Sequence, residues 1–411
     1  MIQQCKCKTS SSAHKTRYSN KLRSESFSVP LQSYPITSYS TMRFFVPILF
    51  LSLLILSLSY CSWRIYHVLP FSNSILRAFI SLLPFVLTLG SVTCFMVGFD
   101  RIAYQPAVIL YEICTSWIII LLYIFLAFLL IDVLRLIHLL PSDILTANWK
   151  TLGTLTVLLA SLFVYGNIHY QHKYREEITL PTHGKVLKPT KIVLLSDLHL
   201  GYHNRAETFK KWISLINKEN ADAILIAGDI IDISIRPLLE ENIAELFHTF
   251  NAPVYASLGN HEYFSGEPRA KLFFRDAHIM LLRDTALTLP ANILVVGRDD
   301  RTNPHRASTK QILASVHKND TLTAPYSILL DHQPYHLEES EEAGIDFQFS
   351  GHTHHGQVWP ISWITDLIYE DAFGFYSRGD TNYYVSSGLG IWGGKFRIGT
   401  RSEYVVLTLL P

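Results

Sequence analysis

The stretch FQFSGHTHHGQVWP, residues 347–360, holds three histidines in four positions. Four other apolar runs in the second half of the chain also end in groups that can bind metal. In chain order, the five runs end in Asp197 and His199; Gly228 and Asp229; Gly259, Asn260, His261 and Glu262; Asp331 and His332; and His352 and His354. Carboxylates, imidazoles and one carboxamide, without a thiolate, suit Mn²⁺, Fe or Zn²⁺. These groups are too many for one ion, whereas two ions that share one carboxylate would use them all.

The residues between these runs predict the elements that must position the ligands. Each run has the continuous apolar character of a strand buried on both faces. The segment 206–220 is helical in pattern, because its apolar residues recur at i, i+3, i+4 and i+7. These residues are Phe209, Trp212, Ile213 and Ile216, and the segment 236–250 behaves similarly. Strands and helices therefore alternate, which predicts an α/β domain with its site at the carboxyl ends of the strands.

Two of the motifs place polar residues at i and i+2. In extended chain such pairs point to the same side, so Leu198 and Thr353 are expected to point the other way. Glycines 228, 259 and 351 each precede a polar residue, which lets the backbone turn sharply near a crowded site.

The first half of the chain is much more apolar than the second. Four stretches approach the roughly 20 apolar residues that span a bilayer, and they are residues 44–62, 78–98, 107–131 and 149–166. The Ser-, Thr- and Tyr-rich tail before them is expected to be disordered, and Met42 is a candidate start of translation. The predicted organisation is a tail at 1–41, a transmembrane helical region at 42–168, a polar linker at 169–189 and the α/β domain at 190–411.

Charge and cysteine content exclude some functions. The net charge is +1, which argues against a broad nucleic-acid surface, because phosphate binding needs clustered Lys and Arg. All five cysteines lie at or before position 114, so the histidine-rich half has no thiolate metal site.

With these motifs in place, residues 190–410 resemble the calcineurin-like metallophosphoesterases. That family carries D-x-H, G-D, G-N-H-[DE], a later H, and G-H-x-H. Here they stand as Asp197-Leu198-His199, Gly228-Asp229, Gly259-Asn260-His261-Glu262, His332, and Gly351-His352-Thr353-His354. Within the family the chain is most similar to the bacterial membrane-associated branch, which continues GHTHGGQ and later carries YVSxGLG and a closing Glu. The counterparts here are Gly356-Gln357, YYVSSGLG and Glu403.

The resemblance implies a fold and a set of roles. The fold would be a four-layer α-β-β-α sandwich with two central sheets. The first metal would take Asp197, His199, Asp229 and His354, and the second Asp229, Asn260, His332 and His352, with Asp229 bridging. His261 would not bind metal but would face the scissile phosphate and donate a proton. We expect two divalent ions, with Mn²⁺ favoured over Zn²⁺ or Fe.

One position departs from the closest branch, which has glycine where this chain has His355. A loop residue in left-handed backbone is the first interpretation, because histidine tolerates that conformation better than most residues. A contact to the phosphate or leaving group is the alternative.

Hydrolysis of a phosphoester is therefore predicted, as a phosphodiesterase or pyrophosphatase rather than a monoesterase. The membrane half favours a lipid-linked substrate. The aromatic segment 358–376 follows the last metal motif and would form a lid against the bilayer, or else an insertion packed on the sheet. The alternatives are an anchored hydrolase of soluble nucleotides or cell-wall phosphoesters, a scaffold without activity, and a transporter or receptor with an attached phosphoesterase.

Basic residues predict the orientation in the cell membrane, because Lys and Arg accumulate in cytoplasmic loops. The richest clusters precede the first span and follow the fourth. The first holds Lys6, Lys8, Lys15, Arg17, Lys21, Arg23 and Arg43, and the second Lys173, Arg175, Lys185, Lys188 and Lys191. A multi-pass protein with both ends, and hence the catalytic domain, in the cytoplasm is expected.

Overall fold

The structure is a computed structural model that describes residues 37–316 and 324–411. Residues 1–36, most of the predicted tail, lie outside the described residues, so the prediction for the tail stays a prediction. The chain divides into two compact units, residues 1–54 and 55–411. Helix α1, Thr37–Val68, crosses that boundary, and the contacts described below lie in the second unit.

Apolar helices fill the first part of the described chain. They are α2 (Ser74–Ser81), α3 (Leu83–Val97), α4 (Tyr104–Leu136) and α5 (Trp149–Gln171), with α1 before them. Four candidate spans result, at Ile48–Val68, Ser74–Val97, Tyr104–Leu136 and Trp149–Gln171, each long and apolar enough to cross a membrane. The four predicted apolar helices are confirmed. The fourth runs past the predicted end at 166, because its polar last turn contacts the α/β domain, where the Tyr170 hydroxyl donates to Asn204.

One cluster of charged side chains lies within these helices. Asp132 accepts hydrogen bonds from the Tyr60 hydroxyl at 2.5 Å and from Arg135 at 2.9 Å, and it also pairs with Arg64. Arg64 and Asp132 each lie one turn before the end of their helix, α1 or α4. The cluster therefore lies near helix ends, where charge is less costly than at the centre of a bilayer.

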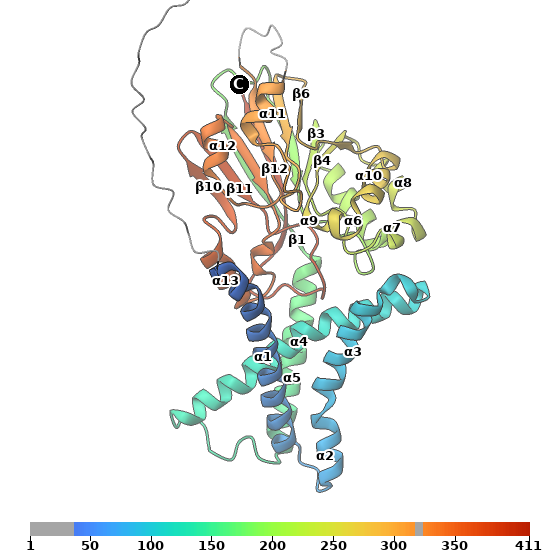
Figure 1. The fold of residues 1–411 in the computed structure, drawn as a ribbon, viewed down its shortest axis with the longest axis vertical. Coiled ribbons are helices and arrows are strands. Elements are labelled where there is room, and N and C mark those ends of the chain that lie inside the picture. Colours follow the sequence, from blue (N-terminus) through green and yellow to red (C-terminus); the bar gives the residue numbers. More distant parts are fainter. Residues whose placement is uncertain (1–36, 317–323) are drawn as a thin grey trace, which may run out of the picture. The chain divides into compact units, whose positions relative to one another are not determined.

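The α/β domain contains two six-stranded mixed sheets (Figure 1). The first has the order β1-β12-β2-β3-β4-β5, with bounds Lys173–Pro181, Ser402–Leu410, Thr190–Leu195, Ala223–Ala227, Val254–Ser257 and Met280–Leu281. The second has the order β10-β11-β9-β8-β7-β6, with bounds Gly374–Arg378, Thr381–Val385, Phe347–Ser350, Tyr326–Leu330, Ile293–Gly297 and Thr285–Leu289. The five strands predicted to end in ligands are β2, β3, β4, β8 and β9.

Helices cover the outer faces of the two sheets. On the first sheet lie α6 (Ala206–Asn217), α7 (Arg236–Glu240), α8 (Ile243–Phe247), α9 (Asn260–Phe264) and α10 (Glu267–Asp276). The other helices are α11 (Thr309–Ser315), α12 (Glu338–Ala343) and α13 (Ile361–Ile368), and α11 and α12 flank the second sheet. Three apolar clusters occupy the three spaces between layers. The predicted four-layer α-β-β-α sandwich is confirmed.

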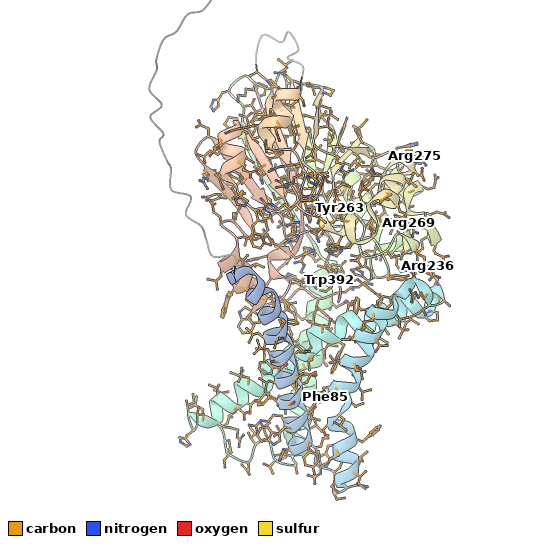
Figure 2. All side chains as sticks on the ribbon, in the orientation of Figure 1. Phe85, Arg236, Tyr263, Arg269, Arg275 and Trp392 are labelled. Atoms are coloured by element: carbon orange, nitrogen blue, oxygen red, sulfur yellow. The ribbon has the colours of Figure 1, made fainter. Side chains whose placement is uncertain are left out.

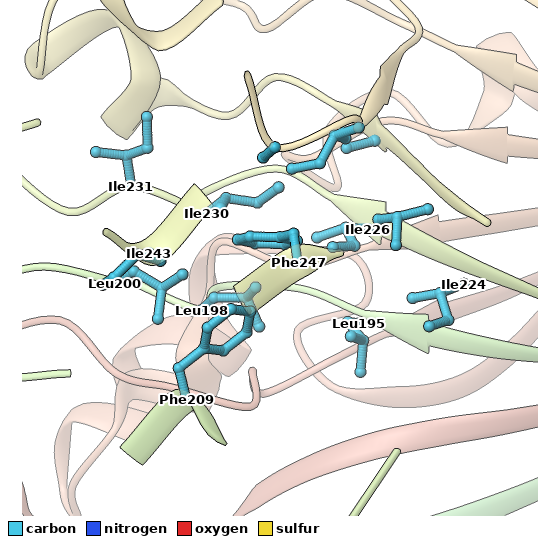
Figure 3. Close-up of a cluster of buried hydrophobic side chains, with 14 of the residues drawn as sticks. Leu195, Leu198, Leu200, Phe209, Ile224, Ile226, Ile230, Ile231, Ile243 and Phe247 are labelled. Atoms are coloured by element: carbon cyan, nitrogen blue, oxygen red, sulfur yellow. The ribbon is translucent and has the colours of Figure 1, made fainter. Parts of the chain in front are cut away.

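Side-chain alternation along the strands divides these clusters. In β2, Val193 and Leu195 face the helical layer, whereas Ile192 and Leu194 face the second sheet. The helical layer is held by the predicted face of α6, on which all four apolar residues are buried. Figure 3 shows Phe209 of α6 near Phe247 of α8, with ring centroids 4.7 Å apart.

The sequence predicts a polar linker at 169–189, and the structure has a strand within that segment. Strand β1 pairs in parallel with β12 over nine residues, from Lys173 to Pro181. Its burial alternates between half-exposed and exposed residues, as expected for an edge strand. The polar composition therefore reflects its place at the edge of the sheet.

Candidate metal centre

The predicted ligands converge from both sheets. Asp197 follows β2, Asp229 follows β3 and Asn260 follows β4 in the first sheet, while the histidines follow β8 and β9 in the second. Carboxyl ends of neighbouring parallel strands meet at one edge of a sheet, which is why residues far apart in sequence come together here. Three groups of His and Asp side chains have ligand atoms within 4.8 Å of one another: Asp197, His199 and His354; His199, Asp229 and His261; and Asp229, His332 and His352.

The backbone of these loops is not extended. Asp197, His199, Asp229, His352 and His354 all have positive φ, between 43° and 70°. The expectation that each i, i+2 pair lies in extended chain is therefore wrong, because β2 and β9 end before the motifs begin. Left-handed backbone is unfavourable for such residues and clusters at functional sites. His352 and His354 accordingly fall into different groups, one with Asp229 and the other with Asp197.

Apolar residues inside the same motifs anchor the loops. Leu198, between Asp197 and His199, is fully buried in the core beneath the helical layer. Ile230 and Ile231, next to Asp229, lie in the same core, and Figure 3 shows them with Leu198 beyond the strand ends. Burial of these apolar neighbours fixes the loops on which the polar side chains stand.

Two of the motif glycines are required for different reasons. Gly228 has φ +74°, so it permits the turn that the sequence predicts. Gly259 has extended backbone with φ −112°, but a Cβ atom there would lie 2.2 Å from Asp229 Oδ1. Its role is close approach of the backbone to the carboxylate.

The first group of ligands is tightly packed. His199 Nε2 lies 3.1 Å from His354 Nε2, 3.8 Å from Asp197 Oδ1 and 3.7 Å from Asp229 Oδ2. His199 and Asp197 are fully buried. Two histidine ligands of one ion, each about 2.1 Å from it, have nitrogens about 3 Å apart. The spacing of the two histidines therefore matches a shared ion.

The second group gathers around the same carboxylate, Asp229. His332 Nε2 lies 3.1 Å from Asp229 Oδ2, and the rings of His332 and His352 are 5.3 Å apart. Asn260 is buried, and its Oδ1 has no hydrogen-bond partner among the described residues. The backbone N–H of the next residue, His261, donates to Asp229 Oδ1 at 2.9 Å. Asp229 thus touches both groups, as a bridging ligand must.

Unpaired lone pairs test whether a metal fits this site. His332 Nδ1 lies 2.7 Å from the carbonyl oxygen of Ala227, which assigns its proton to that nitrogen. Its Nε2 then presents a lone pair to Asp229 Oδ2. In the same way His199 Nδ1 donates to Asp232 Oδ1 at 3.3 Å and turns its Nε2 lone pair toward His354. Two acceptors at such distances need a proton or a cation between them, and the imidazole, carboxylate and amide groups gathered here fit two metal ions.

The charges of the site act differently on its ligand groups. Burial would lower the pKa of His199 and His332, but the neighbouring carboxylates outweigh it and raise the pKa of His199 to about 10 and that of His332 well above its ordinary value, so a metal would displace a proton from these two rings. Burial alone would raise the pKa of Asp229, but the neighbouring His332 and His261 outweigh it and hold that pKa well below its ordinary value. Burial lowers the pKa of His352 to about 4 and that of His354 to about 3. Ionised carboxylates and neutral imidazoles are the forms that bind a metal.

Supporting residues surround the ligands. Glu262, which the sequence places in a motif without a role, accepts three backbone N–H groups, from Asp229, Ile231 and Gly259, and so joins the two loops that follow β3 and β4. Asp232 holds His199, and its position three residues after Asp229 was an available signal.

Arg397 is fully buried and donates to the His354 carbonyl oxygen at 2.7 Å and to the carbonyl oxygens of Ser387 and Gly390. It thereby ties the histidine loop to the chain that follows β11. No local pattern identifies Arg397, because its partners are brought to it by the fold.

His355 has φ +49°, which agrees with the left-handed loop position expected for it. Its ring stacks on Phe373 at 4.6 Å between centroids, and Nε2 lies 3.3 Å from Asp366 Oδ1. These contacts connect the metal loop with the segment 358–376.

Comparison with known proteins agrees with this site. Residues 190–356 match the calcineurin-like phosphoesterase family. The chain is 32% identical over 261 residues to an uncharacterized metallophosphoesterase of Campylobacter jejuni, covering 62% of this chain and 68% of that protein. A metallophosphoesterase of Helicobacter pylori is 31% identical over 55% of this chain. A transmembrane protein with metallophosphoesterase domain from Danio rerio is 27% identical over 62% of this chain. The match covers 61% of each of the last two relatives.

The chain belongs to the calcineurin-like metallophosphoesterases, whose members use a dinuclear metal centre. It is a metal-dependent hydrolase of phosphoesters, and its apolar helices and its transmembrane relatives associate it with a membrane.

Proposed function

We propose that the protein hydrolyses a phosphodiester or pyrophosphate in a lipid-linked substrate held at the membrane surface. The supporting observation is the apolar face of α13, which begins six residues after His355. Trp363 is 61% exposed, Leu367 87% and Ile368 57%. Large apolar side chains exposed together beside a catalytic loop indicate a surface for lipid or for a partner.

The neighbours of α13 favour lipid. Val358 and Ile361 pack in one cluster with Tyr123 of α4 and Phe163 of α5, two of the candidate spans. The Tyr123 hydroxyl donates to the carbonyl oxygen of Trp359 at 2.6 Å. A helix beside membrane spans that exposes Trp and Leu is suited to the bilayer interface. In this proposal, segment 358–376 is a lid between the bilayer and the metal centre.

The proposed ligand roles follow the two groups. Asp197, His199, Asp229 and His354 hold one ion, and Asp229, Asn260, His332 and His352 hold the other, with Mn²⁺ favoured. When bound, two such ions would polarise the phosphate oxygens and make water a stronger nucleophile at neutral pH.

His261 is the proposed proton donor to the leaving oxygen. Its side chain is 12% exposed, and Nδ1 lies 3.6 Å from Asp232 Oδ1. Burial lowers its pKa, while Asp229 and Asp232 act in the opposite direction. The negative charge of an arriving phosphate also favours the imidazolium, so His261 would gain its proton with substrate bound.

Purified full-length protein, reconstituted with Mn²⁺, Zn²⁺ or Fe²⁺, tests the substrate class. A lipid pyrophosphate in vesicles, a soluble diester and a soluble monoester should be compared at matched phosphate concentration. We expect the highest kcat/KM for the lipid pyrophosphate. Faster hydrolysis of the monoester than of either other substrate would contradict the proposal, and preference for the soluble diester would favour an anchored enzyme with a soluble substrate.

We also propose that the protein is multi-pass and that its catalytic domain faces the cytoplasm. Arg236 donates to the carbonyl oxygens of Asp100 and Ile102, so the connection between α3 and α4 lies on the catalytic side (Figure 2 labels Arg236 there). Arg101 and the basic residues after α5 share that side. Arg64 and Arg135 lie toward the opposite ends of α1 and α4, where Asp132 compensates part of their charge.

Arg77 and Lys150 also belong to the opposite side, and they reduce the excess of basic residues on the catalytic side. If the catalytic domain faces the cytoplasm, a fluorescent protein fused after Pro411 should be bright, and alkaline phosphatase fused at the same place should be inactive. The reverse pattern would put the catalytic domain outside the cytoplasm.

A further inference from the structure

Helix α4 contacts the loop that follows His199 through an aromatic cluster. Tyr111, two turns into this helix, is fully buried. Its ring packs on Phe99 and on Tyr202 of the loop after His199, with centroid distances of 5.1 and 5.6 Å. An aromatic cluster thus joins a candidate membrane span to the loop that carries predicted ligands.

The Tyr111 hydroxyl makes one polar contact in this cluster. It donates to Asp232 Oδ2 at 2.5 Å. The other oxygen, Oδ1, accepts from His199 Nδ1 at 3.3 Å and lies 3.6 Å from His261 Nδ1. A single carboxylate therefore stands between the membrane helix and two histidines of the site.

The second oxygen of Asp232 depends on α4. Asp232 is fully buried, and a buried carboxylate oxygen without a donor is costly. Within the described part of the chain, His203 Nδ1 is a second polar neighbour of Oδ2, at 3.6 Å, and that ring donates through Nε2 to the Ile391 carbonyl oxygen at 2.7 Å. The hydrogen bond from the Tyr111 hydroxyl is therefore the short contact that fixes the rotation of the Asp232 carboxylate about its Cβ–Cγ bond.

A carboxylate behind a histidine ligand fixes the ring and its tautomer and strengthens the ligand. We propose that Tyr111 is a positioning residue of the metal centre: through Asp232 it holds His199 with Nε2 directed at the ion, so the membrane helix completes the site as well as anchoring it. The inference rests on the proposed role of His199 as a ligand.

Metal affinity of the full-length protein tests this inference. Metal-free wild type and Tyr111→Phe are titrated with Mn²⁺ in competition with a fluorescent chelator. Loss of a carboxylate partner usually weakens a metal site by about 10–100-fold, and a residue one step further out should cost about 3–10-fold. Excess Mn²⁺ should restore the kcat of Tyr111→Phe to near the wild-type value, which loss of folded protein would not allow.

Tyr104→Phe is the matched control. Tyr104 lies on the same helix, and its hydroxyl donates to a carboxylate of the α/β domain, Glu241, at 2.7 Å. Among the described residues, Glu241 bonds Tyr104, Arg205 and the Ala206 N–H and none of the proposed metal ligands. This variant loses the same group from the same helix and should bind Mn²⁺ like wild type.

A double-mutant cycle separates action through Asp232 from a general loss of packing. Asp232→Asn alone should weaken Mn²⁺ binding by about 10–100-fold. In that background Tyr111→Phe should change the affinity by less than about twofold, since the residue through which it acts is already altered.

Three results would overturn the inference: equal affinity of Tyr111→Phe and wild type, additive effects in the cycle, or failure of Tyr111→Phe to fold, which would assign the hydroxyl to the fold as a whole. Wild type that binds no Mn²⁺ would contradict the ligand assignment itself.

Discussion

The membrane half and the α/β half place their polar residues in opposite ways. In the α/β half, polar side chains follow directly after buried strands, in short motifs such as Gly351-His352-Thr353-His354. In the membrane half, polar residues are scattered, and several find partners far along the chain. Tyr104 contacts Glu241, 137 positions away, and Glu112 accepts from Lys395 at 2.7 Å across 283 positions.

This difference shows what each half contributes. The motifs of the α/β half contain nearly everything that could bind the metals and the phosphate. The membrane half contacts the α/β half through residues such as Tyr111, which bonds Asp232, and Glu112, which bonds Lys395. Activity should therefore depend strongly on the motif residues of the α/β half and more weakly on the contacts of the membrane half.

His261 is the sharpest test within the catalytic half. His261→Ala should lower kcat by about 10²–10⁴-fold, because a positioned general acid contributes that much. Metal content, measured by elemental analysis, should stay at the wild-type level. A nitrophenyl ester, whose leaving group needs no proton, should lose less activity. Loss of metal from this variant would instead make His261 a ligand, as its place in a group with His199 and Asp229 allows.

The exposed face of α13 tests whether the two halves share a membrane surface. Replacing both Trp363 and Leu367 by Ser should reduce hydrolysis of a vesicle-bound substrate by about tenfold or more, since two large apolar side chains would leave the interface. Hydrolysis of a soluble diester should not change. Leu272→Ser, at a 51% exposed position on α10, is the control. Equal losses of activity on both substrates would contradict the proposal that segment 358–376 is a lid at the bilayer.

The smallest effect is expected at His355. His355→Gly introduces the glycine of the bacterial membrane-associated branch. Glycine adopts left-handed backbone without strain, but the variant loses the contacts with Phe373 and Asp366. Activity should stay within about tenfold, or about 1.4 kcal/mol in the barrier, and metal content should not change. Complete inactivation would give this histidine a role in the reaction.

Much of the fold could be predicted because its signals are local. The apolar runs of β2, β3, β4, β8 and β9 and the buried face of α6 are visible in short windows. The edge strand β1 was hidden, since its polar, half-exposed residues resemble a linker until β12 is known to pair with it.

The candidate site divides in the same way. His352 and His354 are evident from their spacing, but their left-handed backbone and their separation into two groups depend on tertiary structure. The part played by Arg397, fully buried and bonded to three carbonyl oxygens of distant loops, is set by the fold and leaves no pattern in its own neighbourhood.

The central claim is that two ions share Asp229, and metal counting on the Asp229→Asn variant tests it most directly. Wild type loaded with Mn²⁺ and desalted should carry two ions per chain. Asp229→Asn should lose metal from both groups together and show no turnover, with circular dichroism unchanged, because the strands do not depend on the ions. Retention of wild-type metal content and activity in Asp229→Asn would contradict the shared, two-metal centre.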